Sequence, residues 1–271
     1  MSHDDGIDWA AAARAFDSLL VPTMFAPWSA EVVARAAITP GDHVIDLGCG
    51  TGPAAMLAAV AAGPSGRVVA LDGQPAMLAV GKAKPSSGAP IDWVVGDAMA
   101  LTYPAASFDV AVACHLLQHL PDPAKALAEV RRVLKPGGRF VTTCWRHFDL
   151  CPAYGALIRG MAAESRIEPE KVHAAAGYRL GDADKLKALL AGAGLRDIEL
   201  VTLEKPTPFA SADGFLAAVS QGGPFTRKSL ESYDDDARGR IFQGVRDALA
   251  RYAVNGRVEV PFAAHILSAR V

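Results

Sequence analysis

The chain has 271 residues, with 27 Lys or Arg against 29 Asp or Glu, so its net charge is −2 at pH 7. This balance, without an arginine-rich run, argues against a nucleic-acid surface. Apolar runs stay shorter than a membrane span, and the polar, acidic residues 1–5 lead us to expect a cytoplasmic protein without a secretory signal.

The cysteines are Cys49, Cys114, Cys144 and Cys151, and they lack metal-ligand spacing. We therefore expect buried, reduced thiols and no metal site.

The first elements in chain order are helical. Residues 7–20 carry apolar side chains at helical spacing, including Trp9 and Phe16. Residues 21–28 are apolar and punctuated by prolines, which predicts a loop. Ser29 is then expected to cap a second helix that runs to Ala37.

A glycine-rich turn follows, in residues 44–53. Strand-like residues that include Asp46 lead into Gly48, Gly50 and Gly52, and Pro53 then opens an alanine-rich helix. The backbone of such a turn can approach a ligand closely. A dinucleotide fingerprint would place its third glycine one residue later. The Asp46 carboxylate would also repel a pyrophosphate, but it would suit a cationic amine or sulfonium.

Strands and helices alternate from this point, which predicts a doubly wound parallel sheet. Residues 145–178 lack strand character and are expected to form a helical insertion over the sheet. Asp182 is expected to cap the next helix, and the acidic run 234–236 is expected to begin another. The expected strands are 43–47, 67–72, 91–95, 108–113, 139–144, 198–203 and 257–271, and the expected helices are 54–62, 75–84, 123–134, 183–191, 212–220 and 235–253.

Asp46-x-Gly48-x-Gly50-x-Gly52 resembles the first motif of the class I S-adenosylmethionine (SAM)-dependent methyltransferases. The resemblance extends over residues 42–204, and it is nearest to the small-molecule, ubiquinone/menaquinone-biosynthesis-like branch, through Leu117-Gln118-His119-Leu120-Pro121-Asp122-Pro123 and Ala191-Gly192-Ala193-Gly194-Leu195. It implies an α/β, Rossmann-like doubly wound sheet, mostly parallel with an antiparallel terminal strand, in a single domain. The expected core is 30–145, 180–205 and 257–271, and the expected helical lid is 7–28, 146–178 and 206–256.

SAM is the cofactor that the resemblance implies, with S-adenosylhomocysteine as its product. Asp46 would support the methionine end of SAM, Asp72 at the end of the second strand would accept the ribose hydroxyls, and Asp97 would accept from the adenine amino group. The expected cofactor contacts are Asp46, Gly48, Cys49, Gly50, Gly52, Asp72, Gly73, Met77, Asp97, Ala98, Met99 and Cys114.

In the family, the loop after the fourth strand faces the cofactor's methyl group and the substrate. Here it contains His115 and His119, our candidate catalytic residues, because a histidine can accept a proton near neutral pH. A structural role for either histidine stays open, and so does the need for a base. The expected substrate contacts are Phe16, Met24, Phe25, Trp28, His115, Trp145, Tyr154 and Phe209.

We therefore expect methyl transfer to an oxygen, nitrogen or carbon atom of a small, partly apolar molecule. Three alternatives stay open: a SAM enzyme with another reaction, a catalytically silent SAM-binding protein and a nicotinamide oxidoreductase. The expected partner is a small molecule, with neither nucleic acid nor a membrane span, and a homodimer is compatible with the chain.

Overall fold

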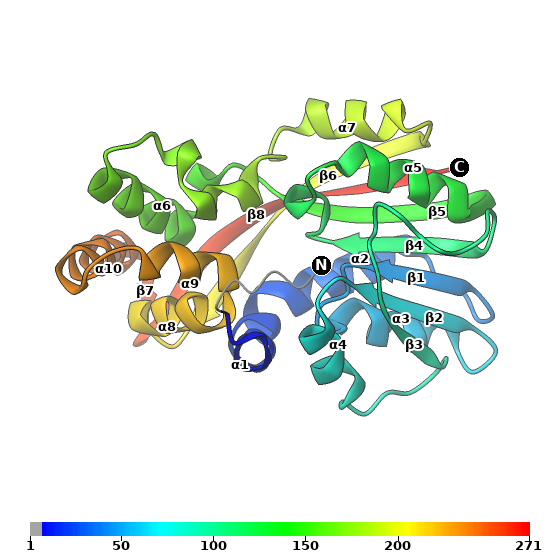
Figure 1. Ribbon diagram of the computed structural model, residues 1–271, viewed down its shortest axis with the longest axis horizontal. Helices are drawn as coiled ribbons and strands as arrows, with labels where there is room; N and C mark the ends of the chain where they lie inside the picture. Colours follow the sequence, from blue (N-terminus) through cyan, green and yellow to red (C-terminus); the bar gives the residue numbers. More distant parts are fainter. Residues whose placement is uncertain (1–6) are drawn as a thin grey trace.

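The computed structural model describes residues 7–271, apart from the side chains of residues 173, 174 and 176. Residues 1–6, whose polarity led us to expect no secretory signal, lie outside the described part. The described chain forms an eight-stranded sheet with the order β3-β2-β1-β4-β5-β8-β6, and β7 pairs with β8 (Figure 1). The strands are β1 (His43–Leu47), β2 (Arg67–Asp72), β3 (Ile91–Val95), β4 (Phe108–Cys114), β5 (Leu134–Trp145), β6 (Arg196–Phe209), β7 (Ala253–Val254) and β8 (Arg257–Arg270).

Strands β1 to β5 are mutually parallel, whereas β8 runs antiparallel to both β5 and β6. Neighbouring residues of β1 enter different cores, since Val44 packs in one cluster and Ile45 in the other. Helices α2 (Ala26–Ala36), α3 (Pro53–Ala62) and α4 (Pro75–Lys82) belong to the first face. Helices α5 (Pro123–Val133) and α7 (Ala183–Gly192) cover the second face. The expected mostly parallel, doubly wound fold is confirmed.

Beyond the sheet, β6 and β8 continue as a long two-stranded ribbon in which Lys205 to Phe209 pair with Phe262 to Val258. A second group of helices gathers along this ribbon (Figure 1): α6 (Pro152–Ser165), α8 (Ala212–Gly222), α9 (Pro224–Glu231) and α10 (Asp235–Leu249). The short 3₁₀ helices η3 (Phe148–Leu150), η4 (Pro169–Lys171), η5 (His173–Tyr178) and η6 (Ala250–Tyr252) connect these elements.

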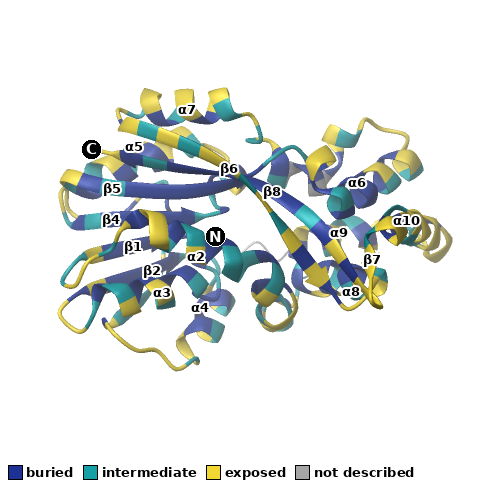
Figure 2. Cartoon of the chain, turned by 180° about the vertical axis from the view of Figure 1, so that it is seen from behind, coloured by how far each residue is buried: buried dark blue, intermediate teal, exposed yellow. Residues whose placement is uncertain are grey.

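Strand β6 runs well past the predicted end at residue 203, through Pro206 and Pro208. These residues cannot donate backbone hydrogen bonds, but β6 is an edge strand and tolerates them. Because β6 lies at the edge of the sheet, many of its residues are exposed, whereas β4 and β5 are mostly buried (Figure 2).

The predicted loop at residues 21–28 is wrong. Helix α1 (Trp9–Ala15) continues into a π-helix, η1 (Phe16–Phe25), and from there into α2. A π-helix has backbone hydrogen bonds that span five residues, and here the Ala26 N–H donates to the Val21 carbonyl oxygen. Pro22 lies inside this π-helix. Ser29 is correspondingly not a cap but lies within α2, where its hydroxyl donates to Cys114 Sγ at 3.7 Å.

Other boundaries differ less. Strand β5 begins at Leu134 rather than at residue 139, α10 ends at Leu249, and α9 interrupts a stretch that we did not divide. Asp182 is a helix N-cap, as predicted, and the acidic run 234–236 begins a helix, as predicted, with Asp234 as its N-cap. The four cysteines are free thiols, and no helix within residues 7–271 is long and apolar enough to cross a membrane. Among the described side chains there is also no cluster of His, Cys, Asp and Glu that could hold a metal ion.

Candidate cofactor and acceptor site

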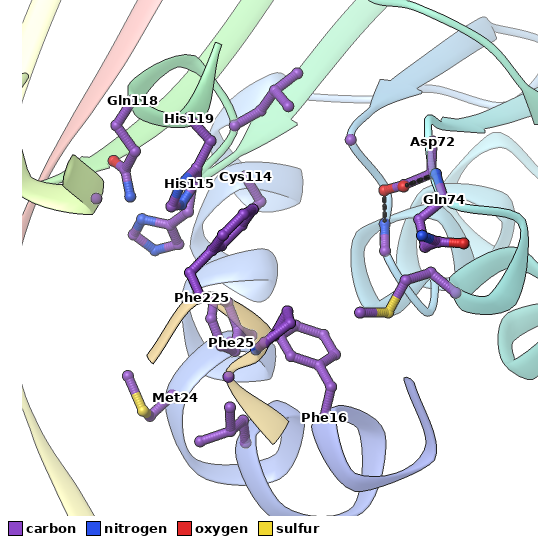
Figure 3. Close-up of a pocket in the computed structure, with 18 of the residues that line it drawn as sticks. Phe16, Met24, Phe25, Asp72, Gln74, Cys114, His115, Gln118, His119 and Phe225 are labelled. Carbon is purple, nitrogen blue, oxygen red and sulfur yellow. Dashed lines mark hydrogen bonds between the residues drawn. The ribbon is translucent and has the colours of Figure 1, made fainter. Parts of the chain in front are cut away.

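A cavity of about 610 Å³ lies where β1, β2, β4 and β5 end, between the sheet and the helices of the ribbon. The core contributes Gly48 after β1, Gly73 after β2, Cys114 at the end of β4 and Trp145 at the end of β5. Three further segments close it: residues 9–29 from the N-terminal helices, 154 and 177–179 from the insertion, and 222–226 around α9. Figure 3 shows Asp72 and Gln74 on one side of this hollow and His115, Gln118 and His119 on the other.

The glycine loop is shaped by its neighbours. Gly48 has a φ of 65°, and a Cβ there would come within 2.6 Å of Leu116 Cδ1. Gly52 does not line the cavity, because the space that its Cβ would need is filled by the indole of Trp93 at 2.3 Å. The third glycine of the motif therefore serves packing against β3 rather than contact with the hollow.

Asp72, the last residue of β2, holds the glycine-rich loop against the end of that strand through hydrogen bonds. One carboxylate oxygen accepts from the Gly50 N–H and the other from the Gln74 N–H, both at 2.8 Å (Figure 3). Burial raises the pKa of Asp72, and the two backbone donors oppose that rise. Each oxygen keeps a further lone pair, so the group can still accept the two hydroxyls of a ribose.

Asp46 lies in the cavity wall with only 1% of its surface exposed. Neither carboxyl oxygen has a hydrogen bond of good geometry from the described residues, although the nearby Ala55 backbone N–H acts to lower the pKa of this carboxyl. Burial raises the pKa of Asp46 to about 8. A buried acid without partners is costly unless a ligand completes it. The residues present therefore fit SAM, because Asp46 can meet its positive charge and Asp72 its ribose.

His115 is held in an unusual conformation directly after β4. Its φ is 55°, and its backbone N–H donates to Thr143 Oγ1 at 3.0 Å. Its ring stacks on Trp145, with centroids 3.7 Å apart and an interplanar angle of 14°, while Phe25 and Trp28 meet it edge-on. The residue is 4% exposed, and neither ring nitrogen has a partner in the described chain. Burial lowers the pKa of His115 well below its usual value, so the imidazole is neutral.

His119 lies four residues further along the same loop, and it also lines the cavity. Its ring stacks on Phe225 of α9 at 6.2 Å. His119 is exposed to the open cavity, and the protein packed around it, with a smaller contribution from Arg179, lowers the pKa of its imidazole. Both candidate catalytic histidines are therefore available as neutral groups near pH 7.

Most of the expected site residues meet at this cavity. Those that line it are Asp46, Gly48, Cys49, Gly50, Asp72, Gly73, Met77, Cys114, His115, His119, Phe16, Met24, Phe25, Trp145 and Tyr154. Those outside its wall are Gly52, Asp97, Ala98, Met99, Trp28 and Phe209.

The residues outside the wall have other contacts. Asp97 is exposed after β3 and accepts from the Met99 N–H at 2.8 Å, with the buried Ala98 between them. Trp28 is buried behind Trp145, which it meets edge-on at 5.5 Å. Phe209, at the far end of β6, packs on Phe215 in the core of the ribbon helices.

Several residues of the wall were not assigned from the sequence, including Gln74, Leu116, Gln118, Tyr178 and Arg179. Gln118 stands within a motif that we recognised, so its polarity among leucines was an available signal. Tyr178 and Arg179 come from the irregular insertion, where no periodicity indicates which side chains turn inward.

Comparison with known proteins places the chain among methyltransferases. Residues 45–142 match the family model described as a methyltransferase domain. A demethylmenaquinone methyltransferase of Symbiobacterium thermophilum is 36% identical over 117 residues, which cover 42% of this chain and 47% of that protein. The chain thus spans about half the length of that relative. The corresponding enzyme of Staphylococcus carnosus is 33% identical over 187 residues, which cover 64% of this chain and 76% of that one.

Among solved structures, the phosphoethanolamine N-methyltransferase 2 of Haemonchus contortus, in complex with SAM, aligns with a TM-score of 0.59. The alignment covers 96% of this chain and 57% of the chain of that structure, at 18% sequence identity, which shows the shared fold. With the glycine loop, Asp46 and Asp72 around one cavity, these relatives confirm the resemblance and SAM as cofactor. The chain belongs to the class I SAM-dependent methyltransferases, in the family that includes the methyltransferases of quinone biosynthesis.

Proposed function

We propose that this protein transfers the methyl group of SAM to a small, ring-containing and largely apolar acceptor, with a reduced quinone as the first candidate. The observation that carries this proposal is one cavity with two chemically different halves. Asp72 lies on one side, and His115 lies on the other with the rings of Phe25 and Trp145 against it (Figure 3). Two relatives are named demethylmenaquinone methyltransferases, which supports a quinone ring as the ligand of the aromatic half of the cavity.

In this proposal the core residues hold and align the cofactor. Asp46 faces the positive charge, Asp72 the ribose, and Gly48, Cys49, Gly50, Gly73, Met77 and Cys114 complete the cavity wall around them. Asp97, Ala98 and Met99 stay candidates for the adenine end. Bound SAM supplies an electrophilic methyl carbon. The contribution of the protein is to align the acceptor with that carbon and to exclude water.

His115 is the proposed proton acceptor. A hydroxylated ring becomes a better nucleophile when it loses a proton, and the neutral imidazole carries one nitrogen with a bare lone pair. His115 lies in the apolar half of the cavity and is neutral at pH 7. His119 is the second candidate, at the position where α9 closes the cavity.

We infer that the chain is a single domain in which the sheet binds SAM and residues 7–28, 146–178 and 206–256 form a lid that selects the acceptor. Each of these segments contributes side chains to the cavity wall, among them Phe25, Tyr154 and Phe225. We further propose a small-molecule rather than a nucleic-acid partner, on the basis of the charge balance, and a cytoplasmic location, on the basis of the four free cysteines. A homodimer stays a prediction.

The test is turnover with SAM and a panel of reduced quinones that lack one ring methyl group, for example 2-prenyl-1,4-naphthoquinol. We expect S-adenosylhomocysteine and a singly methylated product in equal amounts. An altered acceptor without S-adenosylhomocysteine would indicate a SAM enzyme with another reaction. Binding of SAM without conversion of any ring acceptor would overturn the proposal.

A matched variant tests the role of the lid. Phe25→Ala should lower kcat/KM for the acceptor by about tenfold or more, because the ring fills the acceptor half of the cavity. SAM affinity should change far less. Phe209→Ala, which truncates a lid aromatic outside the cavity wall, is the control and should leave the acceptor kcat/KM nearer to that of the wild type.

A further inference from the structure

Two polar side chains in the acceptor half of the cavity, Gln118 and His115, have buried nitrogen atoms without hydrogen-bond partners. Gln118 is 1% exposed, and its Nε2 has no hydrogen-bond partner in residues 7–271. The same is true of both ring nitrogens of His115. A buried polar group left unpaired costs about 1–3 kcal/mol, so a ligand that satisfies these atoms gains affinity. Both residues line the cavity, so their unpaired atoms lie in its wall.

The orientation of Gln118 is fixed by a neighbour. The backbone N–H of Trp145 donates to Gln118 Oε1 at 3.0 Å, and only the amide oxygen can accept that bond. The Nε2 donor is therefore the end left for a ligand. The indole of Trp145 also stacks on His115 at 3.7 Å, so a single residue holds both polar groups in place.

The chemistry of these atoms selects one kind of ligand group. Gln118 Nε2 can only donate, whereas a neutral imidazole offers one donor and one acceptor. A hydroxyl group accepts from the amide and donates to the bare imidazole nitrogen, and thus satisfies both residues. Around this pair the wall is aromatic, from Phe25, Trp145 and Tyr154.

We propose that Gln118 and His115 form a recognition site for a ring hydroxyl, so that this protein selects hydroxylated planar aromatic acceptors and rejects the same rings without the hydroxyl. Gln118 is then a specificity-determining residue of the lid-covered cavity. The inference rests on the proposed function only in taking this ligand to be the methyl acceptor. A site built to hydrogen-bond a hydroxyl discriminates strongly against analogues that lack it.

The experiment measures equilibrium binding of 1-naphthol and of naphthalene to the S-adenosylhomocysteine-saturated protein by tryptophan fluorescence. A merely apolar cavity would prefer naphthalene, the less polar ring. We expect the wild type to bind 1-naphthol at least about tenfold more tightly. Gln118→Met should remove most of this preference by weakening 1-naphthol alone. Equal binding of the two rings by the wild type, or a preference that survives in Gln118→Met, would overturn the inference.

Thr23→Val is the matched control, because the Thr23 hydroxyl is also buried without a partner in the described chain but lies outside the cavity wall. This variant should keep the wild-type preference for 1-naphthol. Naphthalene binding and S-adenosylhomocysteine binding in Gln118→Met should match the wild type, which a general distortion around Trp145 would not allow.

A second measurement needs no variant. The chain has four glutamines, so selective ¹⁵N labelling of their side chains gives a spectrum with few signals. The Gln118 amide signal should shift with 1-naphthol and stay in place with naphthalene. A Gln118 signal that ignores 1-naphthol would refute the inference. Neither measurement requires turnover, so a failure of the proposed methyl transfer and a failure of this recognition site are separately visible.

Discussion

Asp17 and Thr51 form a hydrogen bond of 2.6 Å between the N-terminal π-helix and the glycine loop, with the Thr51 hydroxyl as donor. Lys84, just beyond α4, contacts the same Asp17 oxygen and donates to the Thr51 carbonyl oxygen at 3.1 Å. The bond therefore joins residues 16–25, which belong to the proposed lid, directly to the glycine-rich loop.

Thr51→Val removes this bond without a change in side-chain size. Because a hydrogen bond to a charged group contributes about 1.5–3 kcal/mol, we expect the free energy of unfolding to fall by a similar amount. Urea denaturation measures this loss, and hydrogen exchange should show faster exchange in residues 9–25. Thr102→Val, at an exposed position, should alter neither quantity. Unchanged exchange in residues 9–25 would show that the bond does not hold the lid.

Asp46 should make SAM binding depend on pH. With a pKa of about 8, this carboxyl carries a proton near pH 7 in the free protein, whereas a cationic ligand favours the ionised form. Binding should therefore release a proton, and affinity should rise by up to about tenfold per pH unit from pH 6 until it levels above pH 8. Calorimetry in two buffers of different ionisation enthalpy measures the release. Equal proton release by Asp46→Asn would contradict this assignment.

Asp72→Ala should weaken both SAM and S-adenosylhomocysteine. The variant loses the acceptor for the ribose hydroxyls and the two bonds from the Gly50 and Gln74 backbone. A loss of about 1.5–3 kcal/mol, or roughly ten- to a hundredfold in Kd, is expected by calorimetry. Asp92→Ala, which removes an exposed carboxylate paired with Arg67, is the control and should leave both affinities intact. If Asp72→Ala binds like the control, the motif assignment fails.

His115→Asn separates the imidazole from the backbone that carries it. Asparagine tolerates the positive φ better than other side chains, so the fold should survive. If His115 accepts the acceptor's proton, kcat should fall by about 10² or more. SAM affinity should stay within about threefold, which marks a loss confined to the chemical step. His43→Asn, an exposed histidine at the start of β1, should behave as the wild type. If both variants lose kcat equally, or if neither variant loses kcat, His115 is not the proton acceptor.

The local sequence determined the sheet and the cofactor half of the site. Strands β1, β2 and β3 have the predicted bounds, because apolar runs bounded by turn residues leave few alternatives. Asp182 caps a helix as expected, and the acidic run 234–236 begins another, since helix starts depend on residues within one turn. Asp46, Gly48 and Asp72 meet at one edge because the carboxyl ends of parallel strands must do so.

The acceptor half depended on contacts between residues far apart in the chain. Pro22 signals a loop locally, but packing keeps residues 16–25 helical. Pro206 ends a strand in most settings, yet the edge position of β6 lets it continue.

Contacts between residues far apart in the chain also decide the environment of individual side chains in the site. The role of Gln118 follows from the Trp145 backbone N–H, 27 residues away, and the neutrality of His115 follows from its burial. Gly52 was assigned to the cofactor because the motif gives no sign of Trp93 beside it. Short-range signals fix where a strand ends and which residues follow it, whereas burial and pairing exist only after distant segments have packed.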